Sequence, residues 1–408
     1  MRLFKKLFKI ILLIPNLFYL FSKILLGKKK NIFFIEGGFG VISTHCHLIS
    51  LLDKKDNLMV WVVKDEFNPI EMINFWRQKL DVLTLKLPVS KKKIILKIIE
   101  KLISFFGKNY FDLFSMEKKF ILNKKIDYEE LEIKNKNLIG ENYNFYNPQN
   151  LKKNIIFRTP FLLLIKEIEN SNIPIFDKNK IKIRNGDFNL NKDKLVLVYI
   201  RYRAPSSTTS EGISRNGSNL KDFEKSIKYL NNHGYTFLLN GDYDYSHLDY
   251  LKDKGCKIFS YKDFDLNLTE FYIFSALNSS FGICEYGGGI PLMLILKKKL
   301  LLINFFPISH GYPNSLIHPK ICTKKNYKNI DELFVKNSFI EDDPKGNFRV
   351  LNQNEIYDAV YEFYNDFLFK EEIKKHKLST LKSSFSYYFK NSTYAGSYIK
   401  NQEKYFEK

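Results

Sequence analysis

Cysteine is scarce in this chain. Its 408 residues include only Cys46, Cys256, Cys284 and Cys322, which lie far apart and form no Cys-x-x-Cys pair. This spacing argues against a disulfide framework and against a cysteine-based zinc site. A reducing cytoplasm is the compartment that such cysteine usage indicates.

A clean membrane-spanning segment is also missing. Residues 10–26 are almost wholly apolar, but four residues interrupt the run: Pro15, Asn16, Ser22 and Lys23. A spanning helix needs about 20 consecutive apolar residues. Lysines fill positions 28–30, where a signal peptide would carry small residues for cleavage. The sequence therefore favours neither a spanning helix nor a cleaved signal.

Residues 1–30 nevertheless have the composition of a membrane-surface segment, with eight basic residues and no acidic one. Four of the basic residues recur at helical spacing beside apolar side chains: Arg2, Lys5, Lys6 and Lys9. Lysines favour anionic headgroups, whereas Phe and Leu favour the acyl boundary. We therefore predict an amphipathic helix that lies on a membrane. A true span and a helix packed on the protein's own core are the alternatives.

Arginine is the third scarcity, because only eight of the 65 basic residues are arginine. In such a composition an arginine marks a position that needs a planar, forked, permanently charged donor. Phosphate and carboxylate groups are the usual partners of that fork. Arg201, Arg203 and Arg215 share one loop, which follows an apolar run over residues 195–200. Charged groups at the end of a buried strand predict a ligand site in an α/β protein.

Within this loop, Arg201 and Arg203 alternate along the strand end, so their side chains should point to opposite faces. We therefore favour Arg201 and Arg215 as phosphate or acceptor contacts, with structural salt bridges as the alternative. Asn216 follows directly and belongs to the same candidate site.

Hydrophobic residues make up 45% of the chain, and 408 residues are too many for one ordinary core. Apolar runs alternate with helical patterns in two sets. The expected strands are 31–35, 58–63, 82–87, 195–200, 235–240, 257–260, 281–284 and 300–304. The expected helices are 43–52, 92–106, 161–170, 219–233, 291–297 and 354–369, and the helical pattern continues to residue 384. This alternation predicts the α/β class: two facing Rossmann-like domains with parallel sheets, and a ligand crevice between them.

Gly287, Gly288 and Gly289 lie between a predicted strand and a predicted helix that has Pro291 in its first turn. Glycines let a backbone approach a ligand closely, and a helix start offers unpaired N–H groups and a positive dipole end. A diphosphate fits such a place. A turn that uses glycine only for its dihedral angles is the alternative. We add Glu285, which precedes the glycines, to the candidate ligand contacts.

Gly241 and Asp242 end another predicted strand and complete the candidate ligand set. Asp242 and Asp244 also form an Asp-x-Asp pair, which can hold Mg²⁺ or Mn²⁺ on a nucleotide diphosphate. A polar turn explains the pair more simply, so we expect neither a metal nor another cofactor. Candidate catalytic bases come from the first half of the chain: Glu36 in a glycine loop, and His45 shortly after it.

The segments from Glu211 to Asn216, from Leu220 to Leu230, and from Gly234 to Asp242 resemble a bacterial family from surface-polysaccharide gene clusters. Gly287–Gly289 and Asn304–Pro307 match its later motifs. These clusters are of the O-antigen and capsule type, and members are assigned as glycosyltransferases. The resemblance covers residues 195–310. It implies a GT-B architecture in which the second domain holds the nucleotide-sugar donor, mainly without metal.

Four parts are then expected: the membrane-surface helix over 1–30, an acceptor-side domain over 31–190, a nucleotide-sugar domain over 191–350 and C-terminal helices over 351–408. The protein would be a glycosyltransferase at the cytoplasmic face of the inner membrane. It would move a sugar from a nucleotide-diphosphate donor to a surface-glycan acceptor that is lipid-linked.

Three other functions stay open: a sugar-nucleotide epimerase with the same fold, a metal-dependent transferase that uses Asp242 and Asp244, and a non-enzymatic basic protein. The formal net charge of +21 fits a membrane, a phosphorylated substrate or nucleic acid. A lysine excess on solvated faces explains that charge equally well. We expect no nucleic-acid partner, because nucleic-acid binding would leave the glycine turn and the arginine loop unexplained.

Overall fold

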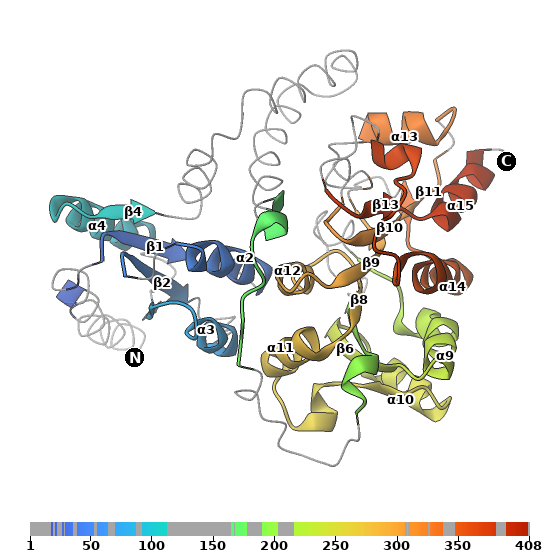
Figure 1. Cartoon of the computed structure of the whole chain (residues 1–408), viewed down its shortest axis with the longest axis horizontal. Helices are drawn as coiled ribbons and strands as arrows, with labels where there is room; N and C mark the ends of the chain where they lie inside the picture. The colour runs from blue at the N-terminus through green and yellow to red at the C-terminus, as the bar shows by residue number, and fades with distance from the viewer. Residues whose placement is uncertain are drawn as a thin grey trace, which may run out of the picture. The chain divides into compact units, whose positions relative to one another are not determined.

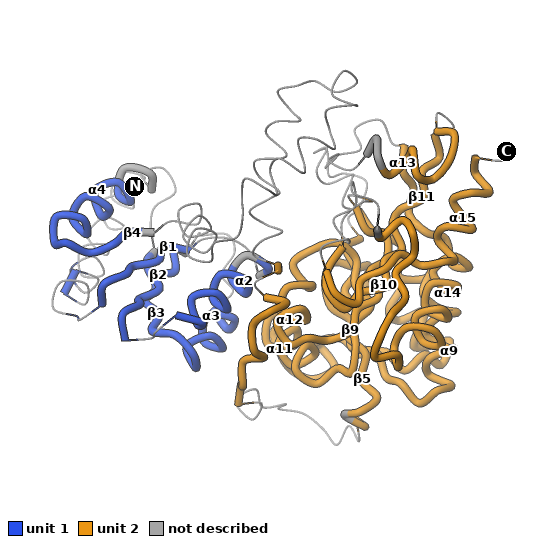
Figure 2. Tube along the Cα trace, turned by 45° about the horizontal axis from the view of Figure 1, so that its top comes forward, with its two compact units in different colours: residues 1–126 blue, residues 127–408 orange. Residues whose placement is uncertain are grey.

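The computed structural model describes residues 18, 21–22, 27, 29–35, 39–52, 55–63, 70–86, 92–111, 165–166, 168–177, 190–202, 216–306, 308, 311–324, 327–337, 347–380 and 389–406. The chain divides into two compact units, Met1–Ile126 and Asp127–Lys408 (Figure 2). The predicted four-part division, with its boundary at residue 190, stays a prediction.

The first unit contains a four-stranded parallel sheet in the order β3-β2-β1-β4 (Figure 2). Its strands are β1 (Asn31–Ile35), β2 (Asn57–Val63), β3 (Val82–Lys86) and β4 (Asn109–Phe111). Its described helices are α2 (Phe39–Ser50), α3 (Ile70–Trp76) and α4 (Lys92–Phe105). The strands are apolar on both faces because helices cover a parallel sheet on both sides. Ile99 and Ile103 of α4 complete one core cluster with side chains of β1, β2 and β3.

The second unit contains a seven-stranded sheet in the order β13-β10-β9-β8-β5-β6-β7, and every neighbouring pair is parallel. Its strands are β5 (Leu195–Arg201), β6 (Thr236–Asp242), β7 (Ile258–Phe259), β8 (Phe281–Cys284), β9 (Lys299–Phe305), β10 (Ser315–Pro319) and β13 (Ser392–Tyr394). The chain runs outward from β5 to β7 and then returns to β8 on the other side of β5. This is the doubly wound order of a Rossmann fold with one added strand.

Helices cover both faces of this sheet (Figure 1). They are α9 (Glu224–Asn232), α10 (Tyr245–Asp253), α11 (Leu268–Asn278), α12 (Ile290–Ile295), α13 (Ile330–Asn337), α14 (Gln353–Glu362) and α15 (Gly396–Phe406). Helix α14 contacts α9 and α15, and α11 contacts α12 on the other side of the sheet. Short 3₁₀ or π turns span Lys192–Lys194, Leu220–Phe223, Tyr261–Phe264, Phe363–Phe367 and Lys377–Thr380, and β11 (Ile321–Cys322) pairs with β12 (Phe348–Arg349) antiparallel.

Local sequence explains where two of these helices begin. Asn267 and Glu270 form a capping box at the start of α11, and Asn352 and Glu355 form another at the start of α14. In each box the asparagine accepts a backbone N–H and the glutamate accepts the N–H of the asparagine, so two unpaired donors of the helix end are satisfied.

The predicted α/β class with two parallel sheets is confirmed. The predicted helix over 219–233 begins as a 3₁₀ turn before α9. Helix α11 is absent from the predicted elements, because most of its residues are buried and no amphipathic period remains. Most of residues 1–30 lie outside the described part, and so does the predicted surface helix. Within that part, no helix is long and apolar enough to cross a membrane.

Arg349 holds the C-terminal helices together. Its guanidinium donates two bonds of 2.7 Å to the Glu355 carboxylate, and two more, of 3.0 and 2.6 Å, to the Tyr405 hydroxyl. Burial of Glu355 raises its pKa, but the hydrogen bonds from Arg349 and Asn352 together lower the pKa by more than burial raises it. The net shift is therefore downward. This arginine therefore uses its fork on a carboxylate of its own chain.

His318 is buried within β10. Its Nδ1–H donates to the Pro319 carbonyl at 3.3 Å, and its ring meets the edge of Tyr398 at 5.3 Å between centroids. Burial lowers the pKa of His318 to about 4, although the Pro319 carbonyl and Glu355 oppose that change. The imidazole is therefore neutral in the folded protein near neutral pH, which fits a packing role.

We predict that His318 makes the protein less stable in acid. The unfolded imidazole titrates near pKa 6.5 and the folded one near 4, so protonation between these values favours the unfolded chain. His318→Phe should flatten the fall in the free energy of unfolding between pH 6.5 and pH 4, measured by chemical denaturation at a series of pH values. The exposed His233, changed to Phe, is the control. An unchanged slope in His318→Phe would contradict the prediction.

Candidate functional site

Those predicted ligand residues of the second unit that the structure describes gather at the carboxyl ends of its strands. Arg201 ends β5 and pairs in register with Asp242, which ends β6. Glu285 directly follows β8, the neighbour of β5 on the other side, and the glycine turn comes next. The strand order reverses between β5 and β8, and ligands bind at such a switch point in open α/β sheets.

Glu285 is the most constrained polar residue at this edge. Only 1% of it is exposed. Its Oε2 accepts the backbone N–H of Arg201 at 2.7 Å. Its Oε1 accepts the backbone N–H of Ser218 and the side-chain amide of Asn304, each at 2.7 Å. The carboxylate therefore joins the end of β5, the segment before α9 and the end of β9.

A second layer of hydrogen bonds extends this network. The Ser218 hydroxyl donates to the Leu351 carbonyl at 3.0 Å and accepts from the Asn304 amide at 2.7 Å. The Leu351 N–H donates to Asn304 Oδ1 at 2.7 Å, just before α14 begins. Asn304 has a φ of 49°, a conformation that asparagine tolerates better than most residues. Every polar atom of its side chain is thus used inside the protein.

The protonation of Glu285 reflects two opposing effects. Complete burial raises its pKa, because the charged form loses its hydration. The three N–H donors and the charge of the buried Lys320 lower it, without cancelling the rise. Gly217 makes room for this carboxylate, since a Cβ there would lie 1.5 Å from Glu285 Oε2. Glu285 and Gly217 therefore form one packing unit.

The glycine turn has a packing reason that the sequence analysis missed. The Tyr199 ring of β5 lies against it, so a Cβ on Gly289 would be 2.2 Å from Tyr199 Cδ2. A Cβ on Gly287 would be 2.9 Å from Tyr199 Cε1. Gly289 has an ordinary φ of −78°, so close approach of the ring, not an unusual dihedral angle, requires glycine there. Close approach of a phosphate to Gly287, Gly288 or Gly289 stays a prediction.

Arg201 lies beside this turn. Its Nη1 donates to the Tyr286 carbonyl at 3.5 Å, one residue before Gly287. The guanidinium and the glycine turn are therefore neighbours, as the diphosphate hypothesis requires. Arg203 and Arg215 lie outside the described residues, and Asn216 is half-buried at the start of the segment that Glu285 holds.

Gly241 and the two aspartates have separate structural environments. Gly241 has a φ of 96°, and a Cβ there would lie 2.0 Å from the Ile200 carbonyl oxygen. Asp244 caps α10 by accepting the Ser246 N–H and hydroxyl at 2.9 and 2.8 Å, and these bonds lower its pKa. Asp242 is exposed. Over the residues with described positions, no three His, Cys, Asp or Glu side chains group to hold a metal ion.

The candidate bases belong to the first unit. His45 lies in α2 and is 5% exposed, between buried residues on both sides. Glu36 lies outside the described residues. A role for either residue in proton transfer stays a prediction.

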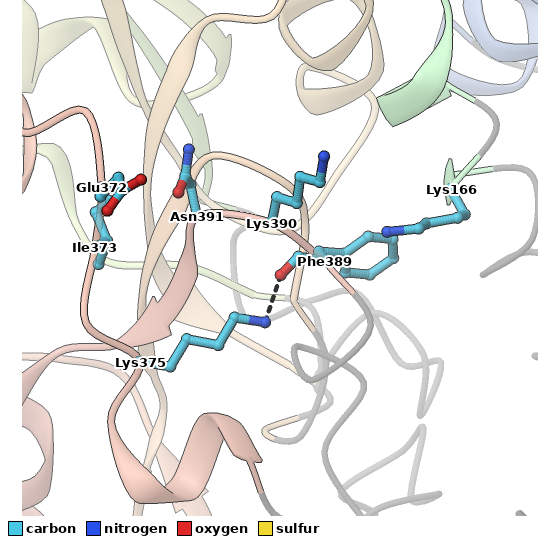
Figure 3. A pocket seen from close by; sticks show the side chains of 7 residues that line it. All are labelled: Lys166, Glu372, Ile373, Lys375, Phe389, Lys390 and Asn391. Atoms are coloured by element: carbon cyan, nitrogen blue, oxygen red, sulfur yellow. Dashed lines mark hydrogen bonds between the residues drawn. The ribbon is translucent and has the colours of Figure 1, made fainter.

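A pocket of about 430 Å³ lies elsewhere in the second unit (Figure 3). It is lined by Lys166, Glu372, Ile373, Lys375, Phe389, Lys390 and Asn391. Asn391 directly precedes β13, so the pocket lies at the amino end of that strand, away from the carboxyl ends that carry the candidate site. Lys375 Nζ donates to the Phe389 carbonyl at 2.6 Å. Nearby, Lys297 donates to the Glu169 carbonyl and Lys299 to the Phe367 carbonyl.

No protein-family profile matches the chain, and no curated protein matches it. Three solved structures share 10% identity with it. The glycosyl transferase family 9 protein from Veillonella parvula DSM 2008 has a TM-score of 0.40, over 82% of this chain and 97% of its own. The S. aureus MnaA-UDP co-structure has a TM-score of 0.35 and covers 89% of this chain and 93% of its own. A protein assigned as a UDP-N-acetylglucosamine 2-epimerase from Listeria monocytogenes has a TM-score of 0.36 and covers 83% of this chain and 97% of its own. Likeness at this level gives no information on activity.

We predict that Glu285→Gln destabilises the second unit by roughly 1–3 kcal/mol, because an amide nitrogen would replace one acceptor oxygen and leave a buried N–H unpaired. The free energy of unfolding from denaturant titration measures this. Glu403→Gln is the matched control, since Glu403 is exposed on α15 of the same unit. Equal stability of the two variants would show that the Glu285 network does not hold the site.

Proposed function

We propose that this protein is a glycosyltransferase that moves a sugar from a nucleotide-diphosphate donor to a surface-glycan acceptor that is lipid-linked. One observation carries the proposal. At the switch point of the seven-stranded sheet, Arg201 lies beside the glycine turn, with its Nη1 3.5 Å from the carbonyl that precedes Gly287. A diphosphate is the ligand chemistry that suits a guanidinium next to backbone that a ligand can approach.

In the proposed reaction, the acceptor hydroxyl oxygen bonds to the anomeric carbon of the donor sugar. The bond between that carbon and the diphosphate oxygen breaks, and its electron pair stays on the diphosphate. Negative charge therefore grows on the leaving group, and Arg201 and the N–H groups of Gly287–Gly289 would stabilise it. Arg203 and Arg215 of the adjoining loop would add further positive charge, and Asn216, Gly241 and Asp242 would border the donor.

The acceptor hydroxyl must lose its proton in this reaction. If the transfer inverts the anomeric centre, Glu36 or His45 would take that proton as a general base. Neither a metal nor another cofactor has a role in the proposal, because Arg201 supplies the charge that a metal would otherwise provide. Residues 1–30 would hold the enzyme at the cytoplasmic face of the inner membrane, where a lipid-linked acceptor is present.

Glu285 contributes indirectly to this chemistry. Both of its oxygens accept hydrogen bonds from the protein, and one of them fixes the backbone N–H of Arg201. The guanidinium thus starts from a backbone position that cannot shift without breaking a buried bond. Preorganised charge of this kind stabilises a leaving group without reorganising during the reaction.

We predict that Arg201→Lys weakens nucleoside-diphosphate binding about tenfold or more, since lysine replaces a fork by a point charge. Isothermal titration with UDP, GDP and dTDP would measure this. The substitution leaves the backbone N–H that Glu285 accepts, so the fold should persist. Arg77→Lys is the control, because Arg77 is an exposed arginine of the first unit. If none of the three binds, or if both variants bind like the original chain, the proposed donor site is wrong.

Incubation with a bound donor alone separates transfer from epimerisation. A transferase needs an acceptor for the reaction, whereas an epimerase changes the sugar of the donor without one. Nuclear magnetic resonance of the recovered nucleotide sugar would show a changed epimer directly. If the sugar of the donor changes its configuration, the epimerase alternative would be correct in place of glycosyl transfer. The proposed nucleotide site would still stand.

A further inference from the structure

Helix α4 of the first unit has two apolar sides. Ile99 and Ile103 are each 1% exposed and belong to the core. Ile98 and Phe105, in contrast, are 53% and 82% exposed. They are seven residues apart, so they lie on one side of the helix, two turns from each other. Packing on the sheet of the first unit explains why Ile99 and Ile103 are apolar, but it does not explain the apolar Ile98 and Phe105.

The end of α4 holds its aromatic residues in a defined place. The Phe105 and Phe106 rings meet at right angles with centroids 5.2 Å apart, and Phe106 is 46% exposed. Gly107, with a φ of 68°, donates to the Ser104 carbonyl, and Lys108 donates to the Ile103 carbonyl. These two bonds and the left-handed glycine form a Schellman motif. The exposed rings therefore project from a properly terminated helix.

The same outer side of α4 is basic. Lys97 and Lys101 are exposed, and by helical spacing both lie along one side of the line from Ile98 to Phe105. Glu100 is the only acidic residue in α4. Exposed apolar side chains bordered by lysines are the pattern of a helix that lies in a membrane interface. The lysines also specify the kind of surface, because they favour anionic headgroups.

The described residues near the amino terminus lie close to this surface. Lys108, three residues after Phe105, donates from Nζ to the Gly27 carbonyl at 2.7 Å. Phe21 packs against the core cluster that includes Ile99 and Ile103. Gly27, which follows residues 1–26, therefore lies beside the carboxyl end of α4. The membrane contact predicted for residues 1–30 would therefore belong to the same unit as this side of α4.

We propose that this outer side, defined by Lys97, Ile98, Lys101, Phe105 and Phe106, is a second membrane-contact surface that binds an anionic lipid bilayer. The apolar side chains enter the acyl boundary, and the lysines remain among the headgroups. Two contacts from one unit restrict its orientation on the membrane more than a single contact does. The surface does not depend on the proposed sugar transfer and is tested without it.

Fluorescence at position 105 of the full chain tests the proposal. The four native cysteines are buried, so Phe105→Cys gives one accessible thiol for an environment-sensitive dye. Vesicles of phosphatidylcholine with phosphatidylglycerol should shift the emission to the blue, and acyl-chain quenchers should dim it. Phe369→Cys is the control, because Phe369 is 67% exposed in the second unit. The unlabelled original chain, treated with the same dye, gives the background.

Charge is tested separately by vesicle sedimentation. Lys97→Gln with Lys101→Gln should weaken partition onto the anionic vesicles by about fivefold per lysine. Lys257→Gln with Lys400→Gln, at exposed positions of the second unit, is the matched control.

Three results would overturn the proposal. The chain does not bind the vesicles, or it binds them with no change at position 105, or the emission is already blue-shifted without lipid. The second result leaves membrane contact to residues 1–30 alone, and the third shows that protein covers this side of α4. UDP titration of the same labelled protein reports separately on the nucleotide site, so the two proposals can fail independently.

Discussion

The carboxylate of Glu285 determines the geometry of the second unit's carboxyl edge. A buried charge is costly unless donors surround it, and here Arg201, Ser218 and Asn304 each supply an N–H at 2.7 Å. The three donors come from segments far apart in the chain, so the network forms only when β5, β8 and β9 lie side by side. The position of Arg201, on which the proposed donor site depends, follows from this network.

Arginine and lysine have different tasks in this chain. Arg349 binds the Glu355 carboxylate with two parallel bonds, whereas Arg201 reaches toward the glycine turn. Only Arg349 is shown using its fork, whereas Arg201 donates from one nitrogen to a backbone carbonyl. The scarcity of arginine therefore does not tell whether the partner of a given arginine is internal or a ligand. Several lysines also have structural roles, since Lys297 and Lys299 donate to backbone carbonyls. These two ammonium groups keep their charge, but they are directed at carbonyls of their own chain.

The glycine turn shows how one motif can serve packing and binding together. Tyr199 lies so close to Gly289 that a Cβ there would overlap its ring, and the same ring also approaches Gly287. The same small residues would let a diphosphate approach from the solvent side. Packing therefore accounts for Gly289 even before any ligand is considered. Ligand binding must be inferred from the neighbouring Arg201 and from the switch point.

The sequence by itself determined the α/β class, because uninterrupted apolar runs such as 195–200 and 281–284 have few other uses than buried parallel strands. It also determined that Arg201, Asp242 and Gly287 follow strand ends. Only the tertiary structure decided that β5 lies between β6 and β8, which brings these residues to one switch point. It also decided that Glu285 is buried and accepts the backbone N–H of Arg201, and that Ile98 and Phe105 are exposed. Such facts depend on contacts between distant segments, and local periodicity carries no information about which segments meet.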